Sequence, residues 1–112
     1  MLLLTGMARA DSPQVVAASA TRDADGTWTI SVSLRHPDTG WDHFADDWQV
    51  LTPDGAVIGD RALTHPHVDE QPFTRSLSGV KIPADVNAVL IRPHCTMDGW
   101  AATPTTLVLP KP

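Results

Sequence analysis

Apolar and polar residues alternate without a break along residues 26–36. Trp28, Ile30, Val32 and Leu34 take one parity, and threonines and serines take the other. A period of two residues is typical of a β-strand with one buried face. Six further short segments also have sequences that favour β-strands, at 13–22, 47–52, 56–64, 72–82, 86–94 and 105–110. Turn sequences such as Asp25-Gly26 separate them, and no segment has the apolar spacing of a helix.

Seven strands with a turn every ten or so residues predict an all-β fold. The expected architecture is a two-sheet antiparallel sandwich of immunoglobulin or fibronectin III type, and a closed barrel is the alternative. A single domain is expected over residues 12–110. The side chains predicted to point inward are Trp28, Ile30, Val32, Leu34, Trp48, Val50, Leu77, Leu90 and Leu107.

The connections between these strands differ in length and content. A sandwich strand crosses the whole domain, so alternate connections lie at the same end. The first, third and fifth are short turns, whereas the second, fourth and sixth are long and polar. All five histidines lie in or beside the long connections, which predicts that they gather at one end of the domain: His36, His43, His65, His67 and His94.

His65 and His67 flank Pro66, which favours an extended backbone at His65. Residues two apart on an extended chain share a face about 6.5–7 Å apart, and two imidazoles at that spacing can converge on one ion. The sequence therefore predicts a Zn²⁺ or Cu²⁺ site made by His65, His67 and His43. Asp42 or Glu70 would orient the imidazole rings. A charged pair between Glu70 and Arg75 is expected to hold this loop against the sheet.

Other residues at the same end allow a different interpretation. Trp41 and Trp100, with His36 and His94, could form a binding surface for a protein or a glycan. We favour a role for the two tryptophans in closing the end of the sandwich, as large aromatic side chains often do. Copper binding through His94, Cys95 and Met97 is a weaker alternative. Burial is the commonest fate of a lone cysteine.

Composition excludes some function classes. The 112 residues carry a formal charge of −5, and the eight basic residues are scattered, so no nucleic-acid partner is expected. The single cysteine excludes an internal disulfide. Because no serine lies in a strand-turn-helix context and tyrosine is absent, we expect a binding module and not an enzyme.

The first residues suggest export. An apolar run precedes Ala8-Arg9-Ala10, a pattern that signal peptidase cleaves, so residues 1–10 are expected to be the remnant of an export signal. A periplasmic or secreted location follows. No other segment approaches the roughly 20 apolar residues of a membrane span. The expected partners are a metal ion or a periplasmic protein.

Three sequence stretches carry a resemblance to known proteins: "WDHFADDW", "PDGAVIGDRALTHPHVDEQPFTRSL" and "VKIP". Together they cover residues from about 41 to 83 and resemble a family of small exported bacterial proteins without an assigned activity. The resemblance implies an exported protein. It supplies no ligand or catalytic residue.

Overall fold

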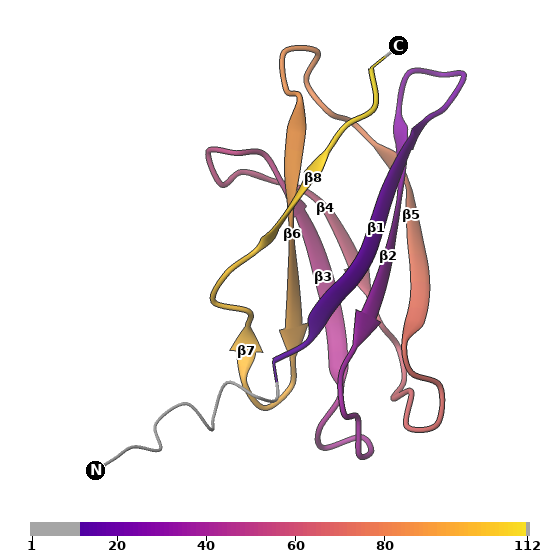
Figure 1. Cartoon of the computed structure of the whole chain (residues 1–112), viewed down its shortest axis with the longest axis vertical. Helices are drawn as coiled ribbons and strands as arrows, with labels where there is room; N and C mark the ends of the chain where they lie inside the picture. Colours follow the sequence, from indigo (N-terminus) through magenta and orange to yellow (C-terminus); the bar gives the residue numbers. More distant parts are fainter. Residues whose placement is uncertain (1–11, 112) are drawn as a thin grey trace.

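The computed structural model describes residues 12–111, so the predicted signal remnant at 1–10 lies outside the described residues. Eight strands make up the described chain (Figure 1): β1 Gln14–Arg22, β2 Trp28–Arg35, β3 Ala45–Leu51, β4 Val57–Ala62, β5 Phe73–Val80, β6 Ala88–Cys95, β7 Gly99–Trp100 and β8 Thr105–Val108. Seven of them match the predicted segments. The additional strand, β7, is a two-residue strand inside the sixth connection.

The strands form two antiparallel sheets that face each other, which confirms the predicted all-β sandwich. The smaller sheet has the order β1-β2-β5. The larger has the order β4-β3-β6-β7. The strand β8 also pairs with β6, along residues 88–91, whereas β7 pairs with residues 94 and 95. No β-ladder joins the two sheets among the described residues, so the closed barrel is excluded. The assignment to the immunoglobulin or fibronectin III type stays a prediction.

The core lies between the sheets and contains most of the side chains predicted to point inward. Five of the nine are fully buried and three more are partly buried against them. Leu90 is the exception, because in β6 the buried parity belongs to Val89 and Ile91. Residues 88–91 are continuously apolar, so alternation could not show which parity faces inward. A one-residue error in register exchanges the two faces of a strand.

The two ends of the sandwich differ as the alternation of connections predicted. The connections after β2, β4 and β6 lie together at one end, and those after β1, β3 and β5 lie at the other (Figure 1). The predicted gathering of the histidines is confirmed, since each of the five lies in or directly beside the first group of connections. We call this end the histidine end. The described residues include no helix, and hence none long and apolar enough to cross a membrane.

Candidate metal centre

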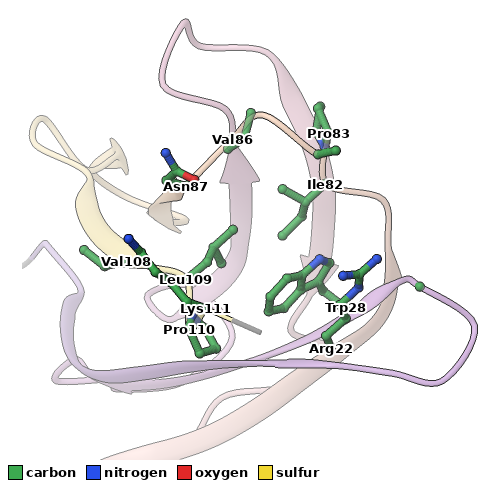
Figure 2. A pocket seen from close by; sticks show the side chains of 12 residues that line it. Arg22, Trp28, Ile82, Pro83, Val86, Asn87, Val108, Leu109, Pro110 and Lys111 are labelled. Atoms are coloured by element: carbon green, nitrogen blue, oxygen red, sulfur yellow. The ribbon is translucent and has the colours of Figure 1, made fainter.

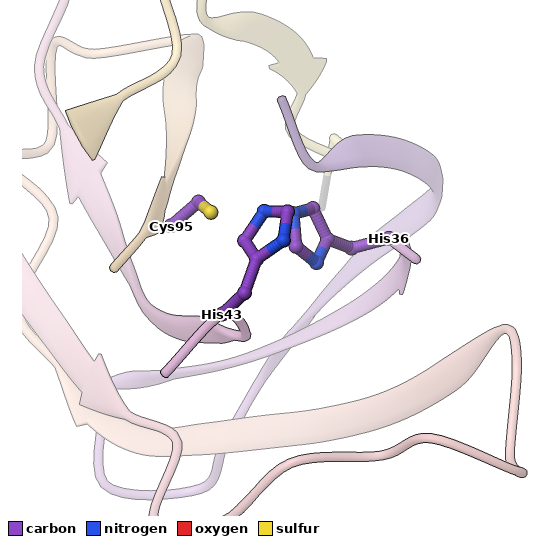
Figure 3. Close-up of side chains that lie close together, drawn as sticks. All are labelled: His36, His43 and Cys95. Atoms are coloured by element: carbon purple, nitrogen blue, oxygen red, sulfur yellow. The ribbon is translucent and has the colours of Figure 1, made fainter. Parts of the chain in front are cut away.

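Three potential metal ligands meet at the histidine end. His36 directly follows β2, His43 lies in the connection to β3, and Cys95 is the last residue of β6. One ligand atom of each lies within 4.8 Å of the other two. Figure 3 shows the two imidazole rings beside each other, with the sulfur of Cys95 directed toward them. Two residues from one connection and one from the opposite sheet therefore converge on one point.

Strand parity explains why two of these side chains point into the protein. His36 continues the inward-facing parity of β2 immediately after Leu34, and it is 1% exposed. Cys95 continues the inward-facing parity of β6 after Ile91 and Pro93, and it is 0% exposed. At the ends of β2 and β6, a potential ligand residue therefore occupies the inward-facing position that apolar side chains occupy along the rest of the strand.

The connection after β2 folds back on itself and brings His43 to His36. The backbone N–H of Thr39 donates to the carbonyl of His43 at 3.0 Å, and the His43 N–H donates to the Gly40 carbonyl at 3.1 Å. The rings of His36 and His43 meet edge to face, with centroids 5.0 Å apart and an interplanar angle of 87°.

A second set of hydrogen bonds ties this connection to β6. The backbone N–H of Phe44 donates to the Thr96 hydroxyl at 3.1 Å, and the Thr96 N–H donates to the Phe44 carbonyl at 3.0 Å. Thr96 directly follows Cys95. These two hydrogen bonds therefore fix the position of the Cys95 thiol relative to the connection that carries His43.

One nitrogen of each imidazole is free. Nδ1 of His36 lies 2.5 Å from Oδ1 of Asp38. A carboxylate can only accept, so His36 carries its proton on Nδ1 and keeps a lone pair on Nε2. Nε2 of His36 and Nε2 of His43 are both buried, and neither has a hydrogen-bond partner among the described residues. Because buried polar atoms normally have a partner, two unpaired nitrogens beside a thiol are candidate donors for a metal ion.

The Asp38 carboxylate fixes the His36 ring through Nδ1, the nitrogen other than the unpaired Nε2. Its carboxylate is completely buried, with a side-chain exposure of 0%. Besides the His36 ring, it accepts the backbone N–H of Ala45 at 3.1 Å and of His67 at 2.8 Å. A carboxylate that accepts from a ligand imidazole fixes its tautomer and raises its basicity, as in many metal proteins. Asp38 therefore orients the His36 ring with Nε2 directed away from the carboxylate.

The donor set suits a first-row transition metal. Donors 2.0–2.3 Å from one ion at tetrahedral angles lie about 3.4–3.8 Å apart. The 4.8 Å limit of the present group is wider by about 1 Å, which small side-chain rotations can close. Two imidazoles and a thiolate fit Zn²⁺ and copper. Three protein donors would leave a further coordination position for water or another ligand.

His65 and His67 lie in the connection between β4 and β5. The ring of His67 is buried and stacks on Phe73, with centroids 3.8 Å apart and an interplanar angle of 9°. Arg75 Nη2 donates to Nε2 of His67 at 2.9 Å. Burial lowers the pKa of His67, and the Arg75 cation lowers the pKa further. Nε2 of His67 therefore accepts a hydrogen bond that helps to order the loop.

His65 is exposed, and its Nδ1 lies 3.0 Å from the Pro66 carbonyl. The rings of His65 and His67 are close, with centroids 4.5 Å apart, but His43 lies with His36 and Cys95 instead. The set of His65, His67 and His43 stays a prediction. The only group of three or more potential ligands in residues 12–111 is the one built on His36.

The connection between β4 and β5 also contacts the residues around His36, through the backbone of His67 and the side chain of Gln71. Gln71 Oε1 accepts the backbone N–H of His36 at 2.9 Å, and its Nε2 donates to the His67 carbonyl at 2.9 Å. The peptide bond between Gln71 and Pro72 is cis. The expected pair of Arg75 and Glu70 is present at 3.9 Å, but Glu70 is 67% exposed, so the contact is weak. Gln71 and Arg75 thus hold the loop more firmly than Glu70.

The residues of the alternative binding surface differ in exposure, and His36 is only 1% exposed. His94 has the parity opposite to Cys95 and faces outward, where its Nδ1 lies 2.5 Å from Asp46 Oδ1 and its ring meets Trp100. Trp41 is 70% exposed and Trp100 is 40% exposed. The expectation that these tryptophans close the end of the sandwich is wrong for Trp41, because 70% of this residue is exposed.

The outer face of the larger sheet also carries an unusual carboxyl group. Burial raises the pKa of Asp47 from its usual 3.8 to about 8, with further contributions from a hydrogen bond to Asp60 and from the charges of Asp60 and Asp46. Because the folded protein holds a proton that the unfolded chain has released, stability falls as pH rises from about 4 to about 8.

Replacement of Asp47 by Asn should remove the loss of stability that the Asp47 carboxyl causes at high pH. Asp47→Asn should match the wild-type free energy of unfolding near pH 3 and exceed it by about 1–2 kcal/mol at pH 9, an estimate reduced for solvent screening. Urea denaturation across this pH range measures the difference. Asp69→Asn, which changes an exposed carboxyl outside the pair, is the control. Parallel pH profiles for wild type and Asp47→Asn would contradict the prediction.

The sequence contained a signal for part of this group of potential ligands, which the prediction did not use. His36 has the parity of Ile30, Val32 and Leu34, and a histidine on the buried parity of a strand must have a partner. Cys95 could not be assigned in the same way, because the register of its strand was ambiguous. The hydrogen-bonding role of Asp38 has no sequence signal, since exposed aspartates are frequent in loops.

Comparisons with known proteins give limited information. A protein of Halomicrobium mukohataei named "Putative lipoprotein" is 41% identical over 71 residues, which are 63% of this chain and 34% of the relative. The chain therefore spans about a third of the length of the curated relative that it matches. No protein-family model matches the chain, and no solved structure matches it.

Proposed function

We propose that this domain is an exported metal-binding module whose centre is formed by His36 Nε2, His43 Nε2 and Cys95 Sγ. The observation that carries the proposal is the convergence of two unpaired, buried imidazole nitrogens on a buried thiol. The Asp38 carboxylate behind His36 supports it, because such a group is typical of a metal-ligating histidine. Zn²⁺ and Cu²⁺ are the first candidate ions.

The proposed location is periplasmic or secreted. The printed name of the relative, "Putative lipoprotein", and the apolar run before Ala8-Arg9-Ala10 support export. Burial of Cys95 also suits an oxidising compartment, since a thiol that is 0% exposed is protected from larger oxidants and from other thiols. A metal ion would hold this side chain as the thiolate.

Cobalt substitution tests the thiolate ligand directly. The metal-free protein, titrated with Co²⁺ without oxygen, should develop a near-ultraviolet thiolate-to-cobalt charge-transfer band at one equivalent. Cys95→Ser should lose this band, since the chain has no other thiol. The visible d–d bands of the wild type report whether the fourth position is filled.

Met97 provides the matched control for the cobalt experiment. It lies two residues after Cys95 but is 67% exposed and outside the ligand group, so Met97→Leu should keep the band. Absence of any band at saturating Co²⁺ would refute a thiolate site. Tight Co²⁺ binding that persists unchanged in Cys95→Ser would point to the His65 and His67 site predicted from the sequence.

A second candidate function is a contact surface for a protein or a glycan. The exposure of Trp41, at 70%, favours it, because an exposed tryptophan at the tip of a connection is a typical contact residue. Trp100 is less available, since the Arg92 guanidinium lies over its ring at 4.9 Å from the centroid. Trp41→Ala should leave metal binding unchanged, which separates this function from the metal centre.

A further inference from the structure

The end of the sandwich opposite the metal centre contains a cavity of about 230 Å³. Its walls are the β1–β2 hairpin, the connection after β5 and the segment that follows β8. Figure 2 shows Trp28 and Ile82 facing Leu109 and Pro110 across the empty space. The interior is mostly apolar, as in most small-molecule sites.

The register of β1 and β2 explains how a charged side chain reaches this cavity. Ala18 pairs with Val32, Ala20 with Ile30 and Arg22 with Trp28. Residues directly opposite in an antiparallel pair point to the same face. Ala18, Ala20 and Trp28 pack against the core, so Arg22 continues the inward-facing side of the strand.

Among residues 12–111, two cations border the cavity and no acidic side chain does. Arg22 and Lys111 are among the lining residues, and neither makes an ion pair with any residue of the described chain. The aspartates of the nearby hairpin accept hydrogen bonds from threonine hydroxyls, Asp23 from Thr29 and Asp25 from Thr27. Arg22 and Lys111 thus have no carboxylate within ion-pairing distance among the described residues.

We infer that this cavity binds a small amphipathic monoanion, an aromatic or branched aliphatic carboxylate. The apolar part would lie between Trp28 and Leu109, and the carboxylate would meet the Arg22 guanidinium and the Lys111 ammonium at the border. The volume is below the 300–1,000 Å³ that is usual for drug-sized ligands, which limits the ligand to one or two rings. This inference is independent of the metal centre, which lies at the other end.

A nuclear magnetic resonance titration of metal-free, ¹⁵N-labelled protein tests the inference with 2-naphthoate as the probe. Saturable shifts are expected at residues 22–28, 82–87 and 108–111, with little change at the histidine end. The neutral analogue 2-naphthylmethanol should bind about 10-fold more weakly, the effect of two partly screened charge contacts. The comparison separates the anionic interaction from simple burial of a ring.

Two variants identify the residues responsible. Arg22→Gln/Lys111→Gln should weaken 2-naphthoate about 10-fold and leave 2-naphthylmethanol unchanged. Lys81→Gln removes one positive charge near the same end but outside the cavity lining, so it should change the affinity less than about 2-fold. Absence of saturable shifts at these segments, equal binding of the two probes, or equal loss in Lys81→Gln would overturn the inference. None of these results bears on the metal centre.

Discussion

Zn²⁺ should raise the melting temperature of the wild-type protein by about 10 °C at a free concentration one hundred times Kd. Binding to the folded state alone then contributes about 2.7 kcal/mol, and each kcal/mol shifts the midpoint of a domain of this size by about 4 °C. In His36→Ala and His43→Ala this metal-dependent shift should disappear, because each variant removes one of three donors. Differential scanning calorimetry with and without Zn²⁺ measures it.

His65→Ala is the matched control for the zinc experiment, since this histidine is exposed and lies at the same end of the domain. It should keep the full metal-dependent shift. Loss of the shift in His65→Ala, with retention in His36→Ala, would instead support the site of His65, His67 and His43. The shift in the wild type should also shrink as the pH falls, because a protonated imidazole does not bind metals.

Replacement of Asp38 should have the largest effect on stability. Asp38→Ala leaves three buried donors without an acceptor: the His36 ring N–H and the backbone N–H groups of Ala45 and His67. The loss is expected to be about 3–5 kcal/mol in the free energy of unfolding, since each unsatisfied buried donor costs about 1–3 kcal/mol. Urea denaturation of the metal-free protein gives this value.

Asp38→Asn separates the role in metal binding from the role in folding. Asn keeps the shape and one acceptor oxygen, so it should cost less stability than Ala but still bind Zn²⁺ about 10- to 100-fold more weakly, as loss of a carboxylate behind a ligand histidine usually does. Competition with a chromophoric chelator measures the affinity. Wild-type stability in Asp38→Ala, or wild-type zinc affinity in Asp38→Asn, would contradict the role assigned to this carboxylate.

The amino-acid sequence by itself determined the strands and the ends at which their connections lie. Alternation along β2 identified its buried face, because a strand exposes successive side chains to opposite sides of the sheet. Each strand crosses the sandwich once, so the order of long and short connections was sufficient to place all five histidines at one end. Local pattern and the connectivity of the chain carried this information.

Only the tertiary structure decided which of those side chains meet. His36 and Cys95 are 59 residues apart in the chain, and their proximity depends on how the two sheets face each other. In β6 the apolar run concealed the inward parity, which the pairing of Cys95 with Ala45 of β3 settles. His65 and His67 have the local spacing of a metal pair, but the His67 ring stacks on Phe73 and its Nε2 accepts a hydrogen bond from Arg75. Local spacing brings residues near each other, whereas burial and hydrogen bonding determine which nitrogens are left free to bind a ligand.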